Sequence, residues 1–293
     1  MEKRKHHYVP KFYLRGFESK YGEFLWIYDK NKKIVFPNTA ENAGCESDFY
    51  SYVKSDGQRD TNTYEDFLAN RIENPANSVI RKLRNQEKIT SEEKKILAKY
   101  MAIMIKRVPM SREMIENLKP NVIKEVSEDI ELQFKIIEKV NPDLKDKIGE
   151  RRRQVKNIFE KVKLETPKEV ILKAMDTKNS MVEEALYNMN WRFFIGKGLN
   201  FLTSDNPCFF FKNIGIGNFD SEISFPISKN IVLFASWGNN IVEGYYQVNA
   251  SIVKEINRRT IYNATRYVYS PSNEDWIMCI IKKSIIKLNR INL

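Results

Sequence analysis

The sequence changes its pattern twice along the chain, and these two changes constrain the fold more than any other feature. Residues 24–28 and 34–36 are rich in aromatic and β-branched side chains around a polar turn, which is typical of a β-hairpin. Apolar residues then recur at helical spacing from Thr63 to Leu186, and the aromatic and β-branched pattern returns at Trp191. We therefore expect an α+β fold, with an antiparallel or mixed sheet built from the N- and C-terminal parts and a mainly helical central region.

No Gly-, Pro- or Ser-rich linker divides the chain, so residues 1–293 are expected to form a single unit. Within it, residues 1–60 and 190–293 are expected to form the sheet-bearing core, and residues 61–189 the helical region. The first expected helices cover residues 63–84, with a break at Pro75, and residues 91–108, after a capping box at Thr90–Glu93. Further helices are expected from Ser111 to Asn141, around residues 151–162, and from Thr166 toward Leu186. The expected C-terminal elements are a hairpin of residues 191–195 and 201–203, strands at 209–212, 223–225, 231–235, 267–269 and 276–281, and a helix at 248–264.

The composition bounds the class of protein. The chain has 293 residues, is 42% hydrophobic, and contains no apolar run near the ~18 residues of a membrane span. The N-terminus lacks the apolar stretch of a secretory signal, so we expect a cytoplasmic protein with no membrane partner. The three cysteines are widely separated and favour neither disulfides nor a cysteine-built zinc site. Most of the net charge of +11 lies in residues 81–173, which favours a polyanionic partner such as nucleic acid.

The densest chemistry lies at residues 5–17, which contain both histidines of the chain. Imidazole titrates near neutrality and can act as an acid, a base or a metal ligand. His7 is the candidate catalytic residue, with a buried imidazole satisfied by the backbone as the structural alternative. His6 follows Arg4 and Lys5, which favours a solvated position for it.

A second cluster, Thr203–Pro207, lies where a predicted strand ends. Its Ser, Asp and Asn side chains are typical of a turn, because they bond to the local backbone. The functional alternative is that Asp205, held rigidly at a strand end, binds a metal or orients a histidine, with Asn206 beside it. Asp205 and His7 are then expected to line one pocket.

The motif His-Tyr-Val-Pro-x-Phe-Tyr-Leu-x-x-Phe at residues 7–17 resembles the opening signature of the bacterial domain-of-unknown-function family 4238. The resemblance continues through Asp48–Tyr50, Arg107–Pro109, Phe201–Pro207 and Phe225–Ser228. It implies an intracellular bacterial protein with His7, Arg107 and Asp205–Asn206 at signature positions. The bacterial setting of the family suggests a role in phage defence or as a toxin.

Arginines at two places in the sequence complete the candidate site. Arg107 follows a predicted buried helix and precedes Pro109, so that it either clamps an anion or caps the last carbonyls of that helix. Arg151, Arg152 and Arg153 form a basic cluster that is either a solvated helix face or a contact to phosphate.

Two classes of function follow. The first is an enzyme acting on nucleic acid or nucleotides, such as a metal-dependent nuclease in which Asp205, with Glu65 or Asp48, holds a divalent metal such as Mg or Mn. In that reading His7, Asp205 and Asn206 are catalytic, and the substrate is bound by Arg107, Arg151, Arg152 and Arg153. The second is a non-catalytic module that binds nucleic acid or a partner protein. The absence of a complete acidic metal-binding motif favours the module, and the polar residues at the signature positions favour the enzyme.

Overall fold

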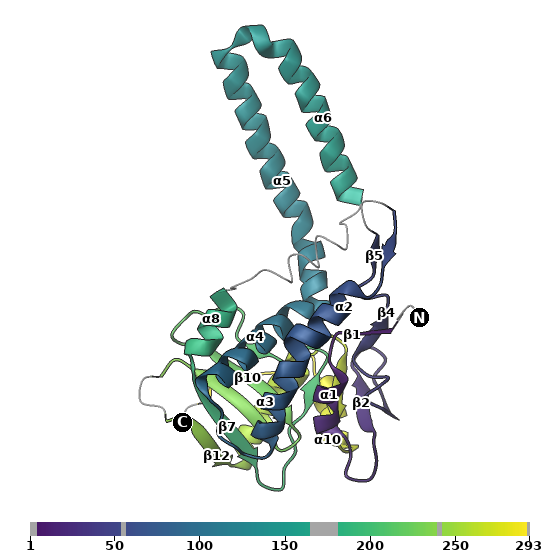
Figure 1. Cartoon of the computed structure of the whole chain (residues 1–293), viewed down its shortest axis with the longest axis vertical. Coiled ribbons are helices and arrows are strands. Elements are labelled where there is room, and N and C mark those ends of the chain that lie inside the picture. Colours follow the sequence, from purple (N-terminus) through teal and green to yellow (C-terminus); the bar gives the residue numbers. More distant parts are fainter. Residues whose placement is uncertain (1–4, 54–56, 165–180, 239–241, 292–293) are drawn as a thin grey trace.

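A long helical hairpin projects from a body of sheets and helices in the computed structural model, which describes residues 5–53, 57–164, 181–238 and 242–291 (Figure 1). The hairpin consists of α5 (Pro109–Val140) and α6 (Lys145–Leu164), joined by a 3₁₀ turn at Pro142–Leu144. We call α5 and α6 the arm and the remainder the body. Helices and antiparallel or mixed sheets together confirm the α+β class predicted from the sequence.

One sheet of the body joins strands from the two ends of the chain. Its order is β3-β2-β13-β8, and all of its pairs are antiparallel. The N-terminal hairpin, β2 (Leu25–Asp29) and β3 (Ile34–Asn38), contributes its inner strand to β13 (Tyr267–Ser270), which in turn pairs with β8 (Thr203–Ser204). The sheet is therefore assembled from N- and C-terminal parts, as the two β-rich segments of the sequence predict.

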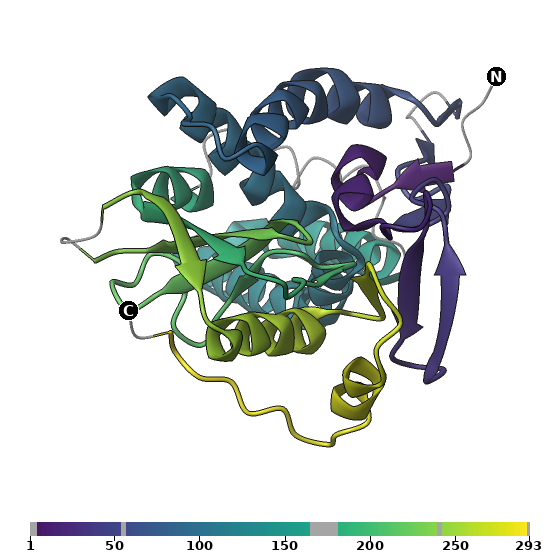
Figure 2. The same ribbon diagram turned by 90° about the horizontal axis from the view of Figure 1, so that it is seen from below.

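A second, mixed sheet forms the middle layer of the body. Its order is β12-β7-β11-β10-β9, in which only the β12–β7 pair is parallel. These strands are β7 (Asn190–Gly196), β9 (Phe209–Phe210), β10 (Glu222–Ser228), β11 (Ile231–Ser236) and β12 (Gly244–Val248). The sheet buries one face in the main core and the other against α9 (Ala250–Asn263), which Figure 2 shows lying along it.

The helical layer packs on the first face of this sheet. Leu97, Tyr100 and Met101 of α4 share one apolar cluster with Trp191 and Phe225 of the sheet. The capping box predicted at Thr90–Glu93 is present, since each residue hydrogen-bonds the other's backbone N–H. The helices of this layer are α2 (Thr63–Leu68), a π-helical turn at Ala69–Glu73, α3 (Asn74–Arg84), α4 (Ser91–Arg107) and α8 (Met181–Asn188).

Short elements at the N-terminus complete the body. Strand β1 (Lys5–His7) pairs with β4 (Cys45–Ser47), and β5 (Tyr52–Val53) pairs with β6 (Arg59–Asp60). Helix α1 (Lys11–Leu14) continues as a 3₁₀ turn at Arg15–Phe17. None of the described helices is both long and apolar enough to cross a membrane.

Two sequence predictions were wrong. Residues 276–281, predicted as a strand, form helix α10 (Asp275–Ile281), because a short apolar run has the same appearance in a buried strand and in a helix. Residues 191–195 and 201–203 do not form a hairpin with each other: β7 pairs with β11 and β12. The predicted helix from Thr166 lies largely outside the described residues.

Candidate functional site

Strand β1 places the two histidines in different environments. Its pairing with β4 alternates the side chains, so that Lys5 is exposed, His6 is fully buried and His7 is half-buried. The expectation of a solvated His6 was wrong, because β1 pairs with β4 and the side chain in the middle of β1, His6, is turned into the body.

His6 is held in one tautomer. The backbone N–H of Tyr50 donates to His6 Nδ1 at 2.9 Å, which leaves the proton of a neutral ring on Nε2. That nitrogen lies 3.9 Å from Glu65 Oε2, and the ring stacks on Tyr50 with 5.6 Å between centroids. Glu65, a predicted metal ligand, is thus the carboxylate partner of His6.

His7 points to the chain around Glu41. Its Nε2 donates to the carbonyl oxygen of Glu41 at 3.1 Å. Burial lowers the pKa of His7 from 6.5 to about 4, and the charges of Lys11 and Lys5 act in the same direction. The ring is therefore neutral at pH 7, and it is a weak base at its free nitrogen.

Arg107 is the centre of a buried polar cluster in this region. Its Nε donates to the Tyr50 hydroxyl at 3.0 Å, one terminal nitrogen donates to Glu73 at 2.7 Å, and the other donates to the backbone oxygen of His7. Burial opposes the charge, but Tyr50 and Glu73 together raise the pKa of Arg107 above its ordinary value. The side chain is only 1% exposed, so an anion would reach it only by displacing Glu73.

Glu73 reaches Arg107 from the π-helical turn. The wider turn at residues 69–73 separates α2 from α3 and ends at Glu73. Single π turns inside helices occur frequently at functional sites, where they re-aim a side chain. Here, the three segments that carry His6–His7, Asp48–Tyr50 and Arg107 meet around one guanidinium.

Asp205 caps a different junction, between α9 and β13. Its carboxylate accepts backbone N–H groups from Thr265 at 2.8 Å, Arg266 at 2.7 Å and Tyr267 at 2.9 Å. Burial raises the pKa of Asp205 from 3.8 to about 6, although these amides oppose the shift. The arrangement matches the turn-like reading of the cluster, in which the carboxylate orders the backbone.

Asn206 extends this junction to the base of the arm. Asn206 and Asn263 each donate from the side-chain amide to the other's backbone oxygen, at 3.1 and 2.8 Å. The Asn206 amide also lies 3.2 Å from the sulfur of Met110, in the first turn of α5. Through these contacts the Thr203–Pro207 loop supports the end of α9 and the start of α5.

The signature segments contact each other at Tyr13, whose hydroxyl lies 2.7 Å from the Thr203 hydroxyl and 2.8 Å from the backbone oxygen of Pro226. Burial raises the pKa of Tyr8 above its ordinary value, and the charge of Asp205 adds to this shift. The contacts of His7 run instead to Glu41, and those of Asp205 run to residues 265–267.

Among the residues that the structure describes, no cluster of three or more His, Cys, Asp or Glu side chains is arranged to hold a metal ion. Glu65 lies beside His6, and Asp48 pairs with Arg59 at 2.7 Å. The two carboxylates proposed as companions of Asp205 therefore have their own partners.

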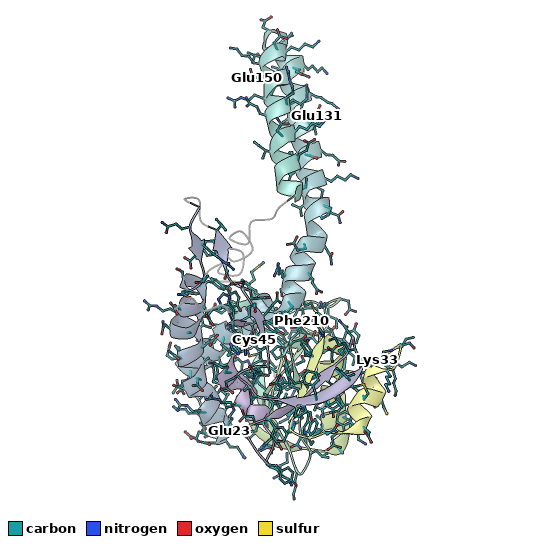
Figure 3. The ribbon with its side chains drawn as sticks, turned by 90° about the vertical axis from the view of Figure 1, so that its right-hand side faces the viewer. Glu23, Lys33, Cys45, Glu131, Glu150 and Phe210 are labelled. Carbon is teal, nitrogen blue, oxygen red and sulfur yellow. The ribbon has the colours of Figure 1, made fainter. Side chains whose placement is uncertain are left out.

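The three arginines of α6 divide into two groups. Arg152 lies between the arm helices, where it pairs with Glu131 at 2.9 Å and with Glu138 at 3.0 Å. Arg151 and Arg153 are exposed on the outside of α6. Figure 3 shows Glu131 and Glu150 on the arm, well away from the body.

Sequence reasoning missed part of this site. Glu73 and Asn263 carry no recognisable motif, because their roles depend on a π turn and on a contact between distant elements. His6 was undervalued, and the alternation of β1 was the signal that could have identified it.

Comparison with known proteins gives one family. The chain belongs to the family described as "Protein of unknown function (DUF4238)", whose match covers residues 5–274. Neither the curated proteins nor the solved structures gave a match.

Replacement of Asp205 by Ala is expected to lower the free energy of unfolding by about 1–3 kcal/mol, because buried amide donors lose their acceptor. Chemical denaturation at pH 7 measures the change. Asp220→Ala is the control, because Asp220 is an exposed carboxylate whose side chain pairs only loosely with Arg290 at 3.3 Å. An unchanged stability of Asp205→Ala, together with lost biological activity, would instead assign Asp205 to chemistry.

His7→Gln is expected to reduce the loss of stability on acidification. The folded state holds the pKa of His7 near 4 and the unfolded chain near 6.5, so the unfolded state binds more protons between these values. Stability contributed by His7 is thus complete above pH 6.5 and is lost as the pH falls toward 4, by about 1–2 kcal/mol after solvent screening. The measurement compares unfolding free energies of the two proteins from pH 7 to pH 4. Asp205 titrates with the opposite sign in this window, and the difference between the two proteins cancels it. Parallel curves would contradict the assignment to His7.

Proposed function

We propose that this protein is a protein-binding module whose arm is the contact element, and that a second copy of the chain supplies the surface it binds. The observation that carries the proposal is a row of large apolar side chains on the outer face of α5. These side chains are 43–58% exposed, although they lie on a helix of 32 residues: Met114, Leu118, Val122, Val126, Leu132 and Ile136.

Their spacing places them on one broad face. Met114 and Leu132 are eighteen residues apart, which is five helical turns, and Leu118 and Ile136 repeat the same relation one turn further. The opposite face of α5 already packs on α6 through residues such as Ile123 and Phe134, which line a groove with Val155 and Phe159. An amphipathic helix buries one apolar stripe, whereas α5 carries a second one.

Pairing of two arms supplies the missing partner. Two helical hairpins can form a four-helix bundle, in which every helix packs against two neighbours and so gains one. Helix α5 has 32 residues and is about 48 Å long, and specific complexes typically bury roughly 800 Å² per partner. Contiguous exposed apolar surface of this kind marks interaction sites.

The charges of the two helices are complementary. Helix α5 has seven acidic and five basic residues, whereas α6 has eight basic and three acidic residues. When one arm packs antiparallel on another, the acidic α5 of each copy lies next to the basic α6 of its partner. This favours self-association over contact with a uniformly charged surface.

The test is the oligomeric state. The purified full chain is expected to be a dimer in light-scattering and sedimentation measurements, and the double variant Leu118→Gln/Leu132→Gln is expected to be a monomer with an unchanged circular dichroism spectrum. Glutamine keeps the helix propensity while it removes the apolar contact.

Tyr21→Gln is the matched control, because Tyr21 is 81% exposed on the body, and it is expected to leave the dimer intact. A monomeric wild-type chain at concentrations of about 100 μM would contradict the proposal, because an interface of this size binds more tightly than that.

A second candidate is binding of nucleic acid by α6, favoured by its excess of basic residues and by the exposure of Arg151 and Arg153. Phosphate contacts release counterions, so affinity falls steeply with salt. Arg151→Gln/Arg153→Gln is expected to reduce the slope of log K against log salt by about 2, measured by fluorescence anisotropy with single- and double-stranded DNA and RNA. Lys95→Gln/Lys99→Gln on α4 is the control pair. Salt-independent or undetectable binding would contradict this candidate and indicate that the basic residues of α6 form a solvated helix face.

The metal-dependent nuclease hypothesis receives less support from the contacts of its residues. Asp205 already accepts three amide hydrogen bonds, and Arg107 is engaged with Glu73. We therefore prefer the binding role for the protein.

A further inference from the structure

A cleft of ≈ 360 Å³ lies at the C-terminal side of the body, and of the signature residues only Leu202 lines it. It is bounded by the loop after β7, by α9 and by α10. Figure 2 shows α10 near one end of α9, on the side of the body away from the N-terminal helices. The volume of the cleft is within the range of small-molecule sites.

The α9 wall of the cleft carries two cations. Lys254 and Arg258 are one helical turn apart and therefore project on the same side of α9. Lys254 is exposed, and one terminal nitrogen of Arg258 contacts Glu255 at 3.1 Å, while its side chain remains 42% exposed. The pair forms a local positive patch that faces a concave space.

The α10 wall supplies an aromatic surface. Trp276 lines the cleft and is 39% exposed, which is a large exposed area for an indole. Leu199, Leu202 and Val253 supply an apolar lining, and Glu274 places one carboxylate at the edge. An aromatic ring on one wall and cations on the other are the groups with which proteins hold a flat ring that carries an anionic substituent.

We propose that this cleft binds a ring-bearing anion of the mononucleotide class. The ring lies against Trp276 and the apolar lining, the phosphate faces Lys254 and Arg258, and Glu274 accepts a hydrogen bond from an amino or imino group of the base. Aromatic carboxylates have a ring and a negative charge, as mononucleotides do, and the test below distinguishes these two classes of ligand.

The wall formed by α10 follows the part of the chain that the family match covers. The match ends at residue 274, and α10, which carries Trp276, begins at Asp275. No residue of the arm lines the cleft, so the proposed site stands whether or not the arm dimerises.

Titration calorimetry of the full chain with AMP, UMP, adenosine, ribose 5-phosphate and indole-3-carboxylate tests the site. The nucleotides are expected to bind, and adenosine and ribose 5-phosphate are expected to bind roughly tenfold more weakly, because each lacks one half of the recognised chemistry. Tighter binding of the indole carboxylate than of either nucleotide would overturn the nucleotide assignment.

Lys254→Gln and Trp276→Leu are each expected to weaken nucleotide binding roughly tenfold, since they remove one charge or one ring from the exposed lining. The matched controls are Lys283→Gln, beyond α10, and Tyr262→Ala, an exposed aromatic residue of α9 outside this cleft, and both are expected to bind as the wild type does. Absence of nucleotide binding at millimolar concentration, equal binding of adenosine and AMP, or binding that both variants retain would overturn the proposal.

Discussion

The buried guanidinium of Arg107 is the interaction on which the N-terminal half of the body depends. A charge that is 1% exposed is tolerated only when its N–H groups are satisfied, and here they are used by Glu73, by the Tyr50 hydroxyl and by the backbone of β1. Together with Arg107, these partners come from four separate segments of the chain. Loss of any one of them leaves a buried charge or a buried acceptor without its partner, which links the position of β1 to the end of α4.

Asp205 has a corresponding structural role in the C-terminal part of the body, where it orders the backbone before β13. Three consecutive amides that lead into β13 donate to its carboxylate, and Asn206 and Asn263 hold the neighbouring loop against α9. Because β13 is the strand that pairs with the N-terminal β2, this junction also fixes how the two ends of the chain meet. Both groups of signature residues thus order the body, and the arm begins between them at Pro109.

The sequence predicted the α+β class and most helices, because periodicity and the Thr90 cap are local signals. It did not predict the parallel pairing of β12 with β7, which depends on contacts between distant segments. For the site, it selected Arg107, Asp205 and Glu65 as special, but not their partners. The tautomer of His6, the π turn that aims Glu73, and the amides around Asp205 are all set by tertiary packing, and no spacing in the sequence encodes them.

The body and the arm differ in how completely their apolar faces are covered. Each face of the mixed sheet is covered, by α4 and its neighbours on one side and by α9 on the other, so the body completes its own core. The arm has only two helices, and α6 covers only one stripe of α5. Arg152, held by Glu131 and Glu138, links the two arm helices. A hairpin with this geometry cannot bury its second stripe by folding alone. The exposed stripe of α5 is therefore the surface that we propose a second copy of the chain covers.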